Sequence, residues 1–405
     1  MSDAQHMSPS PLQVLILVEN LPVPFDRRVW QEALLLVQAG HGVSVICPLT
    51  PDYPEPYEYR EGVHIYRHKL PKEARGVWGF LLEYAAALWG ETHLAFRIYR
   101  RHGIDVIQAC NPPDLLFLVA MWFKPLGVRF VFDHHDPFPE LFENKFPGHP
   151  LLNRLTRWAE WLTFRAADRV ITTSEALRQI AVGRGGVPAD RVTLVRSGPN
   201  LDQLPACLPD PALRENYQYL VLYLGVIGSQ DGVDLLLKAA HEIVRTRRDI
   251  LFAIVGDGPA LPGLKGLATA LGLEPFVRFT GRLVGETLHR WLASADLGVC
   301  PDPYNAFNDK LSMNKVLEYM AFGLPVVLFD LAENRQLAGE AGEVVGRDDP
   351  QDLAAGILKL LADPDRRQIM GQIGRERVSR WFGWHTQAPA YLGVYADLAG
   401  TGKKA

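Results

Sequence analysis

The sequence predicts an α/β protein built from two doubly wound, Rossmann-like domains, and three observations support this fold class. The chain has 405 residues, more than one α/β core usually needs. A succession of buried strand, loop, amphipathic helix and second strand occupies residues 12–48 and begins again at residue 219. Between the two halves, residues 199–211 are rich in proline and polar side chains, which is typical of an interdomain linker.

These observations divide the chain into four parts. We predict a disordered tail over residues 1–11, because this stretch has no apolar signal core. A first domain follows over 12–200 and a second over 201–380. A final helix is expected over residues 381–405, beginning near Trp384.

Composition is that of an ordinary globular enzyme. Hydrophobic residues make up 48% and charged residues 22%, and the formal net charge of −4 argues against a nucleic-acid partner. No apolar run reaches the length of a membrane span. The four cysteines lie far apart without metal-ligand spacing, so we expect a reducing, cytoplasmic location; they are Cys47, Cys110, Cys207 and Cys300.

The first domain opens with a buried strand over residues 12–19 and a loop over 20–25. Asp26 is placed to cap a helix that runs to Ala39, and a second strand follows over 43–48. The loop contains no Gly-x-Gly-x-x-Gly, which argues against a dinucleotide fold. Arg27 and Arg28 fall in the first helical turn, against the helix dipole. They therefore need an anionic partner, unless this helix start is simply solvated.

Two later stretches combine aromatic and basic residues. A helix is predicted over 77–99, and residues 145–169 contain five basic and two acidic side chains with Trp158 and Trp161 at near-helical spacing. These aromatics either pack in the core or contact a membrane surface. The large apolar residues of the first stretch are Trp78, Phe80, Tyr84, Trp89, Phe96 and Tyr99, followed by Arg97, Arg100 and Arg101.

Polar residues follow the next strands at their carboxyl ends, where open α/β sheets bind ligands. A strand over 105–110 ends at Asn111, a helix is expected over 114–124, and a strand over 128–133 leads into His134, His135 and Asp136. The alternative is two surface histidines at a strand end. Zinc is disfavoured, because no further Cys or His has ligand spacing. Strands over 169–174 and 191–198 complete this domain.

The second domain begins with a strand over 219–224, a glycine-rich loop over 225–232 and a helix from Val233. Strands are also predicted over 251–256, 277–281 and 296–301, with a helix over 285–295. Glycines between a strand and a helix let the backbone approach a phosphate. The candidate phosphate and base contacts in these loops are Gly228, Ser229, Gly256, Gly258, Arg282 and Leu283.

The most informative stretch is residues 308–330. It predicts a short helix over 315–322 capped by Ser312 or Asp309, a turn at Gly323 and a buried strand over 324–330. A helix N-terminus binds anions, Lys315 adds a positive charge there, and Glu318 one turn later can accept two hydroxyl hydrogen bonds. A diphosphate beside a ribose fits this pattern. The alternative is a helix–turn–strand unit without a ligand.

This stretch resembles the donor-sugar signature of glycosyltransferase family 4, the retaining enzymes of the GT-B fold. The matching residues are Glu318, Gly323, Pro325, Val326, Val327, Glu333, Gly339 and Gly342, and Gly-Asp-Gly-Pro at 256–259 is similar too. Residues 25–48 resemble the opening of bacterial family 4 enzymes that build surface polysaccharides. Three positions depart from the pattern: Lys310 replaces the first glutamate of the signature, and Val226 and Asp231 replace the loop's Arg and Lys.

The resemblance implies two domains facing a cleft, with the final helix crossing back to the first domain. It implies a metal-independent transfer from a nucleotide-sugar donor to an acceptor hydroxyl, such as that of a lipid-linked glycan, by an enzyme in the cytoplasm or on the inner face of the membrane. His135 and Asp136 would be catalytic, and Glu318 would bind the ribose. Lys315 with the N–H groups of Ser312, Met313 and Asn314 would bind the diphosphate, and Asn308 or Asp309 would replace the missing glutamate. The acceptor side would include Asn20, Arg27, Arg28 and Asn111.

Two other functions fit the same residues. A nucleotide-sugar epimerase of GT-B shape would turn over its donor without an acceptor. A catalytically inactive partner subunit is suggested by Val226, Asp231 and Lys310, which remove the family's usual donor-site charges.

Overall fold

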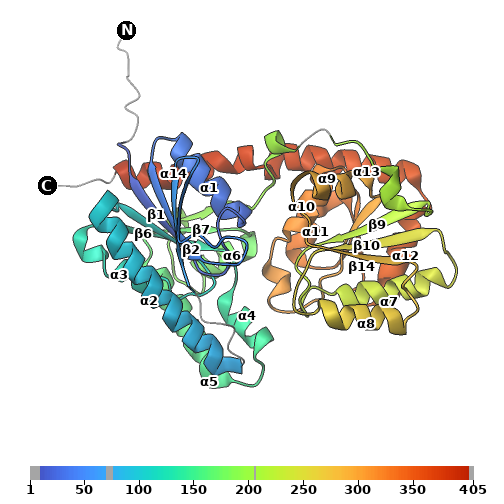
Figure 1. The fold of residues 1–405 in the computed structure, drawn as a ribbon, viewed down its shortest axis with the longest axis horizontal. Helices are drawn as coiled ribbons and strands as arrows, with labels where there is room; N and C mark the ends of the chain where they lie inside the picture. The colour runs from blue at the N-terminus through green and yellow to red at the C-terminus, as the bar shows by residue number, and fades with distance from the viewer. Residues whose placement is uncertain (1–9, 70–75, 205–206, 401–405) are drawn as a thin grey trace, which may run out of the picture. The chain divides into compact units, whose positions relative to one another are not determined.

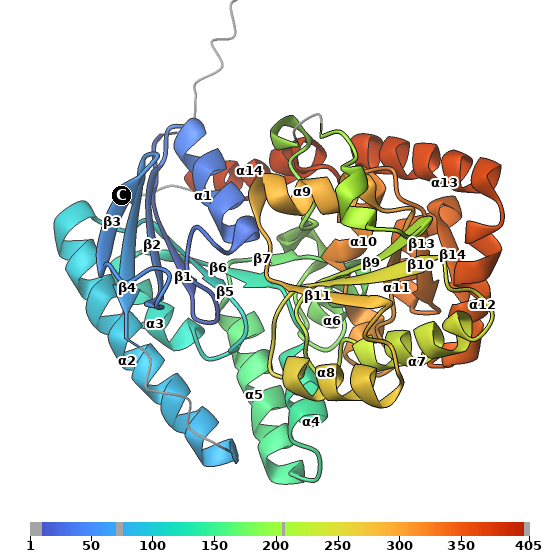
Figure 2. The ribbon, with the colours of Figure 1, turned by 45° about the vertical axis from the view of Figure 1, so that its right-hand side comes forward.

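The computed structural model describes residues 10–69, 76–204 and 207–400. The chain forms two compact units: unit 1 is Met1–Val195 with Ala388–Ala405, and unit 2 is Arg196–Gln387 (Figures 1 and 2). The tail predicted over residues 1–11 falls almost wholly outside the described residues. The side chains of Trp78 and Phe80 also lie outside them.

Unit 1 contains an eight-stranded sheet of order β3-β4-β2-β1-β5-β6-β7-β8. Every neighbouring pair is parallel except β3 and β4, which are antiparallel. The strands are β1 (Gln13–Val18), β2 (Gly42–Pro48), β3 (Tyr57–Arg60), β4 (Val63–His68), β5 (Val106–Cys110), β6 (Arg129–His134), β7 (Arg169–Thr172) and β8 (Val192–Leu194).

Helices cover both faces of this sheet, as a doubly wound fold requires. Side chains of α2, α3 and α5 pack against Leu15, Ile107 and Phe130 on one face, and α1 and the end of α14 lie on the other (Figure 1). The helices are α1 (Arg27–Gln38), α2 (Gly76–His102), α3 (Phe117–Met121), α4 (Phe138–Lys145), α5 (Pro150–Ala166), α6 (Glu175–Val182) and α14 (Trp384–Gly400), with 3-10 turns at Lys124–Leu126 and Ala189–Arg191.

Unit 2 has a six-stranded, all-parallel sheet of order β11-β10-β9-β12-β13-β14. Its strands are β9 (Tyr219–Leu224), β10 (Ile250–Val255), β11 (Val277–Gly281), β12 (Leu297–Cys300), β13 (Val326–Phe329) and β14 (Gly342–Val345). Helices α7 (Val233–Val244), α8 (Leu261–Ala270) and α12 (Pro350–Leu361) pack on one face. Helices α9 (Gly285–Ser294), α10 (Asn314–Ala321) and α11 (Ala332–Ala338) pack on the other. Helix α13 (Pro364–Arg377), a π-helical turn (Val378–Phe382) and short 3-10 turns complete it.

The predicted α/β class with two Rossmann-like parallel sheets is confirmed. The strands predicted at 219–224 and 277–281 agree with β9 and β11, and Asp26 caps α1 by accepting from Val29 N. Strands β3 and β4 were not predicted. The helix expected over 114–124 is only five residues long as α3, because i→i+3 hydrogen bonds close the chain at both of its ends.

The strand predicted over 191–198 ends early. Val195 N still donates to Thr172 O of β7, but Arg196 N donates to the side chain of Gln387. The chain leaves the sheet at this residue because its next backbone donor is satisfied elsewhere, and unit 2 begins here.

Candidate active site

In unit 1, the loop that carries His135 and Asp136 follows β6 at the carboxyl edge of the sheet. Asn111, at the end of β5, holds this loop in place. Its Oδ1 accepts from the backbone N–H groups of His135 at 2.6 Å and Asp136 at 3.2 Å, and its Nδ2 donates to Asp136 O and Asp114 Oδ1, both at 2.7 Å. Asn111 was predicted to bind the acceptor. Its amide positions the two candidate catalytic residues, and its contact with an acceptor stays a prediction.

The imidazole of His135 is oriented by two buried charges. Its Nε2 lies 2.8 Å from Asp133 Oδ2 and 3.0 Å from Arg28 Nε. Arg28 Nη2 also donates to Asp133 Oδ1 at 2.9 Å. Burial alone would raise the pKa of Asp133, but Arg28 and His135 together hold it well below its usual range. Asp133 is therefore ionised and fixes one nitrogen of the His135 ring.

Arg28 has the anionic partners that its position in the first helical turn requires. Besides Asp133, its Nε lies 3.0 Å from Glu32 Oε1, and its Nη1 donates to Val195 O at 2.9 Å. Burial opposes its charge, but Asp133 and Glu32 raise the pKa of Arg28 above its usual value. Burial raises the pKa of Glu32 well above its usual range, while Arg28 lowers it. The predicted acceptor contact of Arg28 must compete with this network, whereas Arg27 is exposed.

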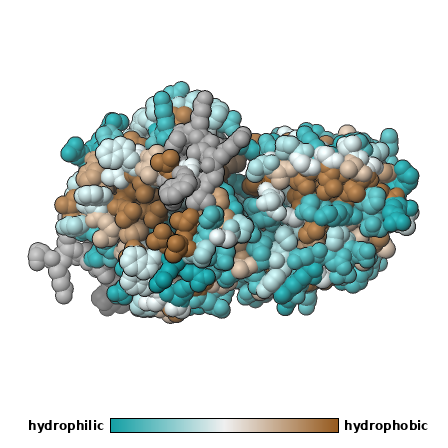
Figure 3. All heavy atoms as spheres, turned by 90° about the horizontal axis from the view of Figure 1, so that it is seen from below, coloured by the Kyte–Doolittle hydropathy of each residue, from teal (hydrophilic) through white to brown (hydrophobic). Residues whose placement is uncertain are grey.

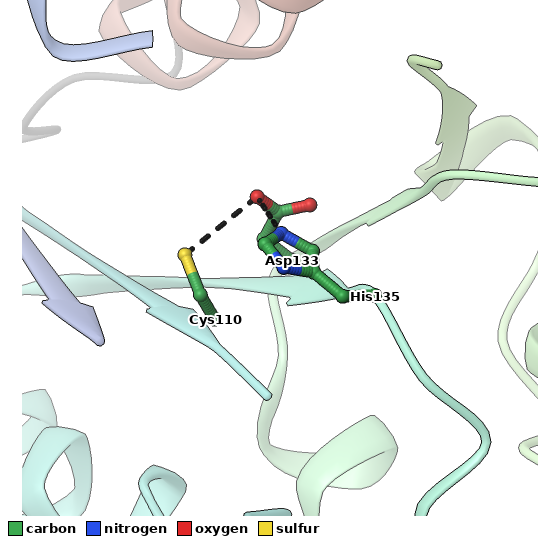
Figure 4. A group of neighbouring side chains, drawn as sticks. All are labelled: Cys110, Asp133 and His135. Carbon is green, nitrogen blue, oxygen red and sulfur yellow. Dashed lines mark hydrogen bonds and ion pairs between the residues drawn. The ribbon is translucent and has the colours of Figure 1, made fainter. Parts of the chain in front are cut away.

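Cys110, Asp133 and His135 present three potential metal ligands within 4.8 Å of one another (Figure 4). The charges around them do not suit a cation. The Arg28 guanidinium already contacts both Asp133 and His135. Burial also raises the pKa of the Cys110 thiol well above its usual value, so the thiolate ligand is disfavoured. We assign no metal to this group.

The neighbouring residues have different environments. Burial raises the pKa of the half-buried Asp136 carboxyl to about 6, although His135 lowers it. His134 is fully buried between the rings of Phe132 and Phe164, and burial lowers its pKa to about 3. The alternative of two surface histidines is therefore wrong for His134, because this ring belongs to the core.

In unit 2, the glycine loops after β9 and β10 pack backbone against backbone. A Cβ on Gly256 would lie 1.8 Å from Gly225 O, and one on Gly258 would lie 2.5 Å from Ile227 O. Only glycine fits at both positions, because any side chain would clash with the facing loop. Gly228 N donates to Asp231 Oδ2 at 2.8 Å, so Asp231 already occupies one N–H that could have faced a phosphate.

Lys315, the second residue of α10, extends beneath the first of these loops. Its Nζ lies 3.0 and 2.8 Å from the two carboxylate oxygens of Asp302 and 4.7 Å above the ring of Tyr223. A Cβ on Gly225 would be 3.2 Å from Lys315 Cε. Burial opposes the charge, but Asp302 raises the pKa of Lys315 well above its usual value. Lys315 is therefore a buried cation paired with Asp302, directly below the glycine loop.

The start of α10 differs from the prediction. Neither Ser312 nor Asp309 caps it: Ser312 Oγ accepts from Arg196 Nη1 at 2.7 Å, and Asp309 Oδ1 accepts from Ala332 N at the start of α11. Met313 is the N-cap residue and its side chain makes no capping bond. Met313 N donates to Asn334 Oδ1 at 3.2 Å, so this amide is already engaged. The first-turn N–H groups that follow it have no side-chain cap.

The other residues predicted to bind the nucleotide sugar or the acceptor have varied environments. Glu318 is buried on α10, one turn after Asn314. The Asn308 side chain donates to Gln230 O at 3.0 Å and Pro303 O at 2.9 Å, so it ties two loops together, and its replacement of the missing glutamate stays a prediction. Ser229 and Arg282 are exposed at the loop surface, Leu283 is half-buried, and Asn20 is exposed after β1.

Sequence reasoning missed several residues of these two clusters. Glu32 and Asp133 of unit 1 and Asp302 of unit 2 supply the partners of the two buried cations. Gln108 was also missed, although a polar residue inside an apolar strand is a usable signal. Asp133 gave the same signal at the end of β6. Asp302 gave a weaker indication, because it lies outside the strand, two residues after the end of β12.

Comparisons with known proteins agree with this architecture. A family model described as Glycosyltransferase Family 4 matches residues 26–203, and one described as Glycosyl transferases group 1 matches residues 218–363. The alpha-D-kanosaminyltransferase of Streptomyces kanamyceticus is 26% identical over 390 residues, which cover 90% of this chain and 98% of that protein.

Solved structures share the fold. A sucrose-phosphate synthase from Thermosynechococcus elongatus superposes with a TM-score of 0.81 at 20% identity, covering 96% of this chain and all of that one. The Anabaena protein HepE in complex with UDP-glucose gives a TM-score of 0.72 at 18% identity, covering 95% of this chain and all of that one. The chain is therefore a glycosyltransferase with the GT-B fold, and its first and second halves match the family 4 and group 1 models respectively.

Proposed function

We propose that the enzyme transfers a sugar, with retention and without a metal, from a nucleotide-diphosphate donor to an acceptor hydroxyl. The observation that carries this proposal is the group at the start of α10 in unit 2. An N-terminus without a side-chain cap, the Lys315 ammonium and the buried Glu318 carboxylate lie on one short helix. Such an arrangement suits a diphosphate followed by a ribose. The UDP-glucose bound to the Anabaena neighbour supports the same ligand class.

The chemical demand of this reaction is the charge on the departing diphosphate, which fixed dipoles and cations must stabilise. The glycine loop supplies backbone but no cation, because Val226 and Asp231 stand at its cationic positions. Lys315 is the cation beneath that loop, and its flexible stem lets it divide its charge between Asp302 and a phosphate. We propose that His135 acts at the reacting sugar and that Asp136 lies beside it.

A thermal-shift panel of UDP, GDP and ADP tests the donor site, with pyrophosphate alone as the matched control. A ligand that binds the native state raises the melting temperature by mass action. We expect one nucleoside diphosphate to stabilise the protein more than pyrophosphate does. No shift with any of them would contradict the proposal and favour an inactive subunit. Turnover of the donor without an acceptor would favour an epimerase.

We further propose that the acceptor is a lipid-linked glycan of surface-polysaccharide synthesis and that unit 1 docks on the inner face of the membrane. The observation behind this is the exposed side of α5. Its exposed residues are apolar or basic without exception: Pro150, Leu151, Arg154, Leu155, Arg157, Trp158, Trp161 and Arg165. Interfacial helices combine these residue types, because aromatic rings enter the headgroup region while arginines pair with anionic lipids.

Neighbouring helices extend this surface. Helix α3 contacts both α2 and α5. We call the exposed apolar residues Trp89, Leu118, Met121, Trp122, Leu155 and Trp158 the α2–α3–α5 surface. Trp89 is 78% exposed and Trp158 is 64% exposed, so neither belongs to the core. Apolar residues also gather on the face of unit 1 that Figure 3 presents. Among the described residues, no helix is long and apolar enough to cross a membrane.

A pocket of about 420 Å³ opens between α4 and the start of α5. Arg154, Arg157, His149 and Asn153 line it, together with one acidic residue, Glu143. Two arginines and an amide beside exposed leucines suit a phosphate on a lipid headgroup. This pocket gives the membrane proposal a charged contact within the apolar surface.

Vesicle sedimentation tests the membrane proposal. At low salt the protein should sediment with vesicles that contain phosphatidylglycerol and not with phosphatidylcholine alone. The double variant Arg154→Glu/Arg157→Glu should bind at least about tenfold more weakly, since each basic residue near the surface contributes about 1 kcal/mol. Lys265→Glu, an exposed charge reversal on α8 of unit 2, is the matched control. Absence of binding to anionic vesicles would refute this docking surface.

A further inference from the structure

The side chain of Gln108 lies at the centre of a buried network in unit 1 that the proposed mechanism does not use. Its Nε2 donates to Glu32 Oε2 at 2.7 Å and to Asp133 Oδ2 at 3.0 Å. Its Oε1 accepts from the hydroxyls of Tyr391, at 2.8 Å, and Tyr395. Both tyrosines belong to α14 and are fully buried. The C-terminal helix is therefore hydrogen-bonded to the centre of the sheet through one amide group.

The two ends of an amide are not interchangeable. The oxygen only accepts hydrogen bonds, and the NH₂ group only donates them. Two hydroxyl donors on Oε1 therefore hold Gln108 with its NH₂ group toward the carboxyl groups. Without these hydroxyls the buried Oε1 loses both of its donors, and the side chain can shift away from Asp133 to find others. Tyr391 and Tyr395 thus select the orientation in which Gln108 supports Asp133.

The oxygen of Asp133 that Gln108 supports is also the one that contacts His135. Asp133 Oδ2 lies 2.8 Å from His135 Nε2. The chain of contacts is tyrosine hydroxyl, amide, carboxylate and imidazole, and every member before His135 is fully buried. Hydrogen bonds in such an environment are stronger than in water, and losing one of them leaves a polar group unsatisfied.

We propose that Gln108 is a positioning residue for His135 and that α14 fixes its orientation through Tyr391 and Tyr395. This inference rests on the proposed role of His135 at the reacting sugar. Helix α14 begins in unit 2 at Trp384 and ends in unit 1. The seating of this helix in unit 1 therefore sets which tautomer and which ring orientation His135 presents.

The test uses the full-length protein with the double variant Tyr391→Phe/Tyr395→Phe, which removes only two hydroxyl oxygens. The imidazole ¹⁵N resonances of His135, assigned with His135→Ala, report its tautomer, and steady-state kinetics report kcat and donor KM. We expect a changed tautomer ratio and about a tenfold lower kcat with an unchanged donor KM, as for a misplaced catalytic group. Gln108→Met should give the same pattern. The control Tyr217→Phe removes the hydroxyl that donates to Pro275 O in unit 2. It should change neither readout.

Unchanged His135 resonances and kcat in the double Phe variant would overturn the inference, even if Gln108→Met fails to fold. A fall in kcat without a change in these resonances would overturn it too, because general loosening of unit 1 would then explain the loss. The proposed role of His135 is checked separately. If His135→Ala keeps the wild-type kcat, that role is wrong, whereas the resonances still decide whether Gln108 positions the ring.

Discussion

Both units bury a cation near the start of a helix, but they surround it with different partners. Each places a cation at the second position of a helix, Arg28 on α1 and Lys315 on α10, and pairs it with an aspartate at the end of a strand. In unit 1 the guanidinium is held on several sides, by Asp133, Glu32, His135 and Val195 O. In unit 2 the ammonium pairs with Asp302, lies 3.5 Å from the Tyr223 hydroxyl and sits over the Tyr223 ring.

This difference indicates what each cluster can do. A planar guanidinium with several fixed partners is a rigid support, and here it orients an imidazole. An ammonium on a flexible stem, paired with one carboxylate below a glycine-rich loop, can follow a charge that develops nearby. We therefore expect the unit 1 cluster to position a group, and the unit 2 cluster to respond to the leaving diphosphate.

The largest effects should come from breaking either buried pair. Asp133→Ala and Asp302→Ala each leave a buried cation uncompensated, which costs about 3–5 kcal/mol of unfolding free energy. Hydrogen exchange read by mass spectrometry should show the loss in β5 and β6 for the first variant and in β9 and β12 for the second. Asp234→Ala breaks an exposed pair with Lys238 and is the control. A loss no greater than that control would contradict the supporting role of these pairs.

His135→Ala should reduce kcat about a hundredfold, because we propose that it acts at the reacting sugar, where a group contributes mainly in the transition state. The donor KM should change little. His93→Ala, an exposed histidine on α2, serves as the control in the same assay. A weaker donor affinity with an unaltered kcat would instead assign His135 to plain substrate binding.

Glu318→Gln should weaken donor binding by about 1.5–3 kcal/mol, the usual worth of a hydrogen bond to a charged group. Calorimetric titration of the nucleotide measures this directly, and thermal unfolding should show an intact fold. Glu274→Gln changes an exposed glutamate of unit 2 and should leave affinity at the wild-type value. Equal affinities for all three proteins would mean that the ribose lies elsewhere.

The Lys315 cluster requires a paired design, because Lys315→Ala alone would leave Asp302 buried without its cation. Lys315→Met/Asp302→Asn removes both charges together and should lower kcat/KM at least tenfold, or about 1.4 kcal/mol. Lys315→Arg should retain part of the activity. Lys265→Ala, an exposed lysine of the same unit, should behave as wild type. Wild-type kinetics in the paired variant would direct attention to Arg27 and Arg282.

The smallest effect concerns pH. Asp136 titrates at about 6 in the folded protein, above its unfolded value of about 3.9. The folded state therefore keeps the proton of Asp136 over a pH range in which the unfolded chain has lost it. The stabilisation of the folded state by this proton is complete below pH 3.9 and is lost as pH rises through 6. Urea unfolding from pH 4 to 6 should show unit 1 weakening by on the order of 1 kcal/mol, and Asp136→Asn should remove that slope. An identical slope in Asp136→Asn and in the exposed Asp190→Asn would show that other carboxyls cause it.

The sequence by itself determined the class of fold, most of the strands and the glycine loops. These features are local: apolar runs, alternation and capping residues such as Asp26 act over a few positions, so they can be read without the rest of the chain. The need of Arg28 for an anionic partner could also be read locally, because it follows from the helix dipole. The identity of that partner could not be read from the neighbouring residues.

Only the tertiary structure decided which residues meet. Arg28 and Asp133 are 105 positions apart, and Gln108 and Tyr391 are 283 apart. The strand order β1-β5-β6 brings the first pair together, and the return of α14 to unit 1 brings the second. Asn334 engages Met313 N, while Ser312 pairs instead with Arg196. Hydrogen bonds and buried charges depend on geometry to within a few tenths of an ångström, and hydrophobic periodicity does not carry that information.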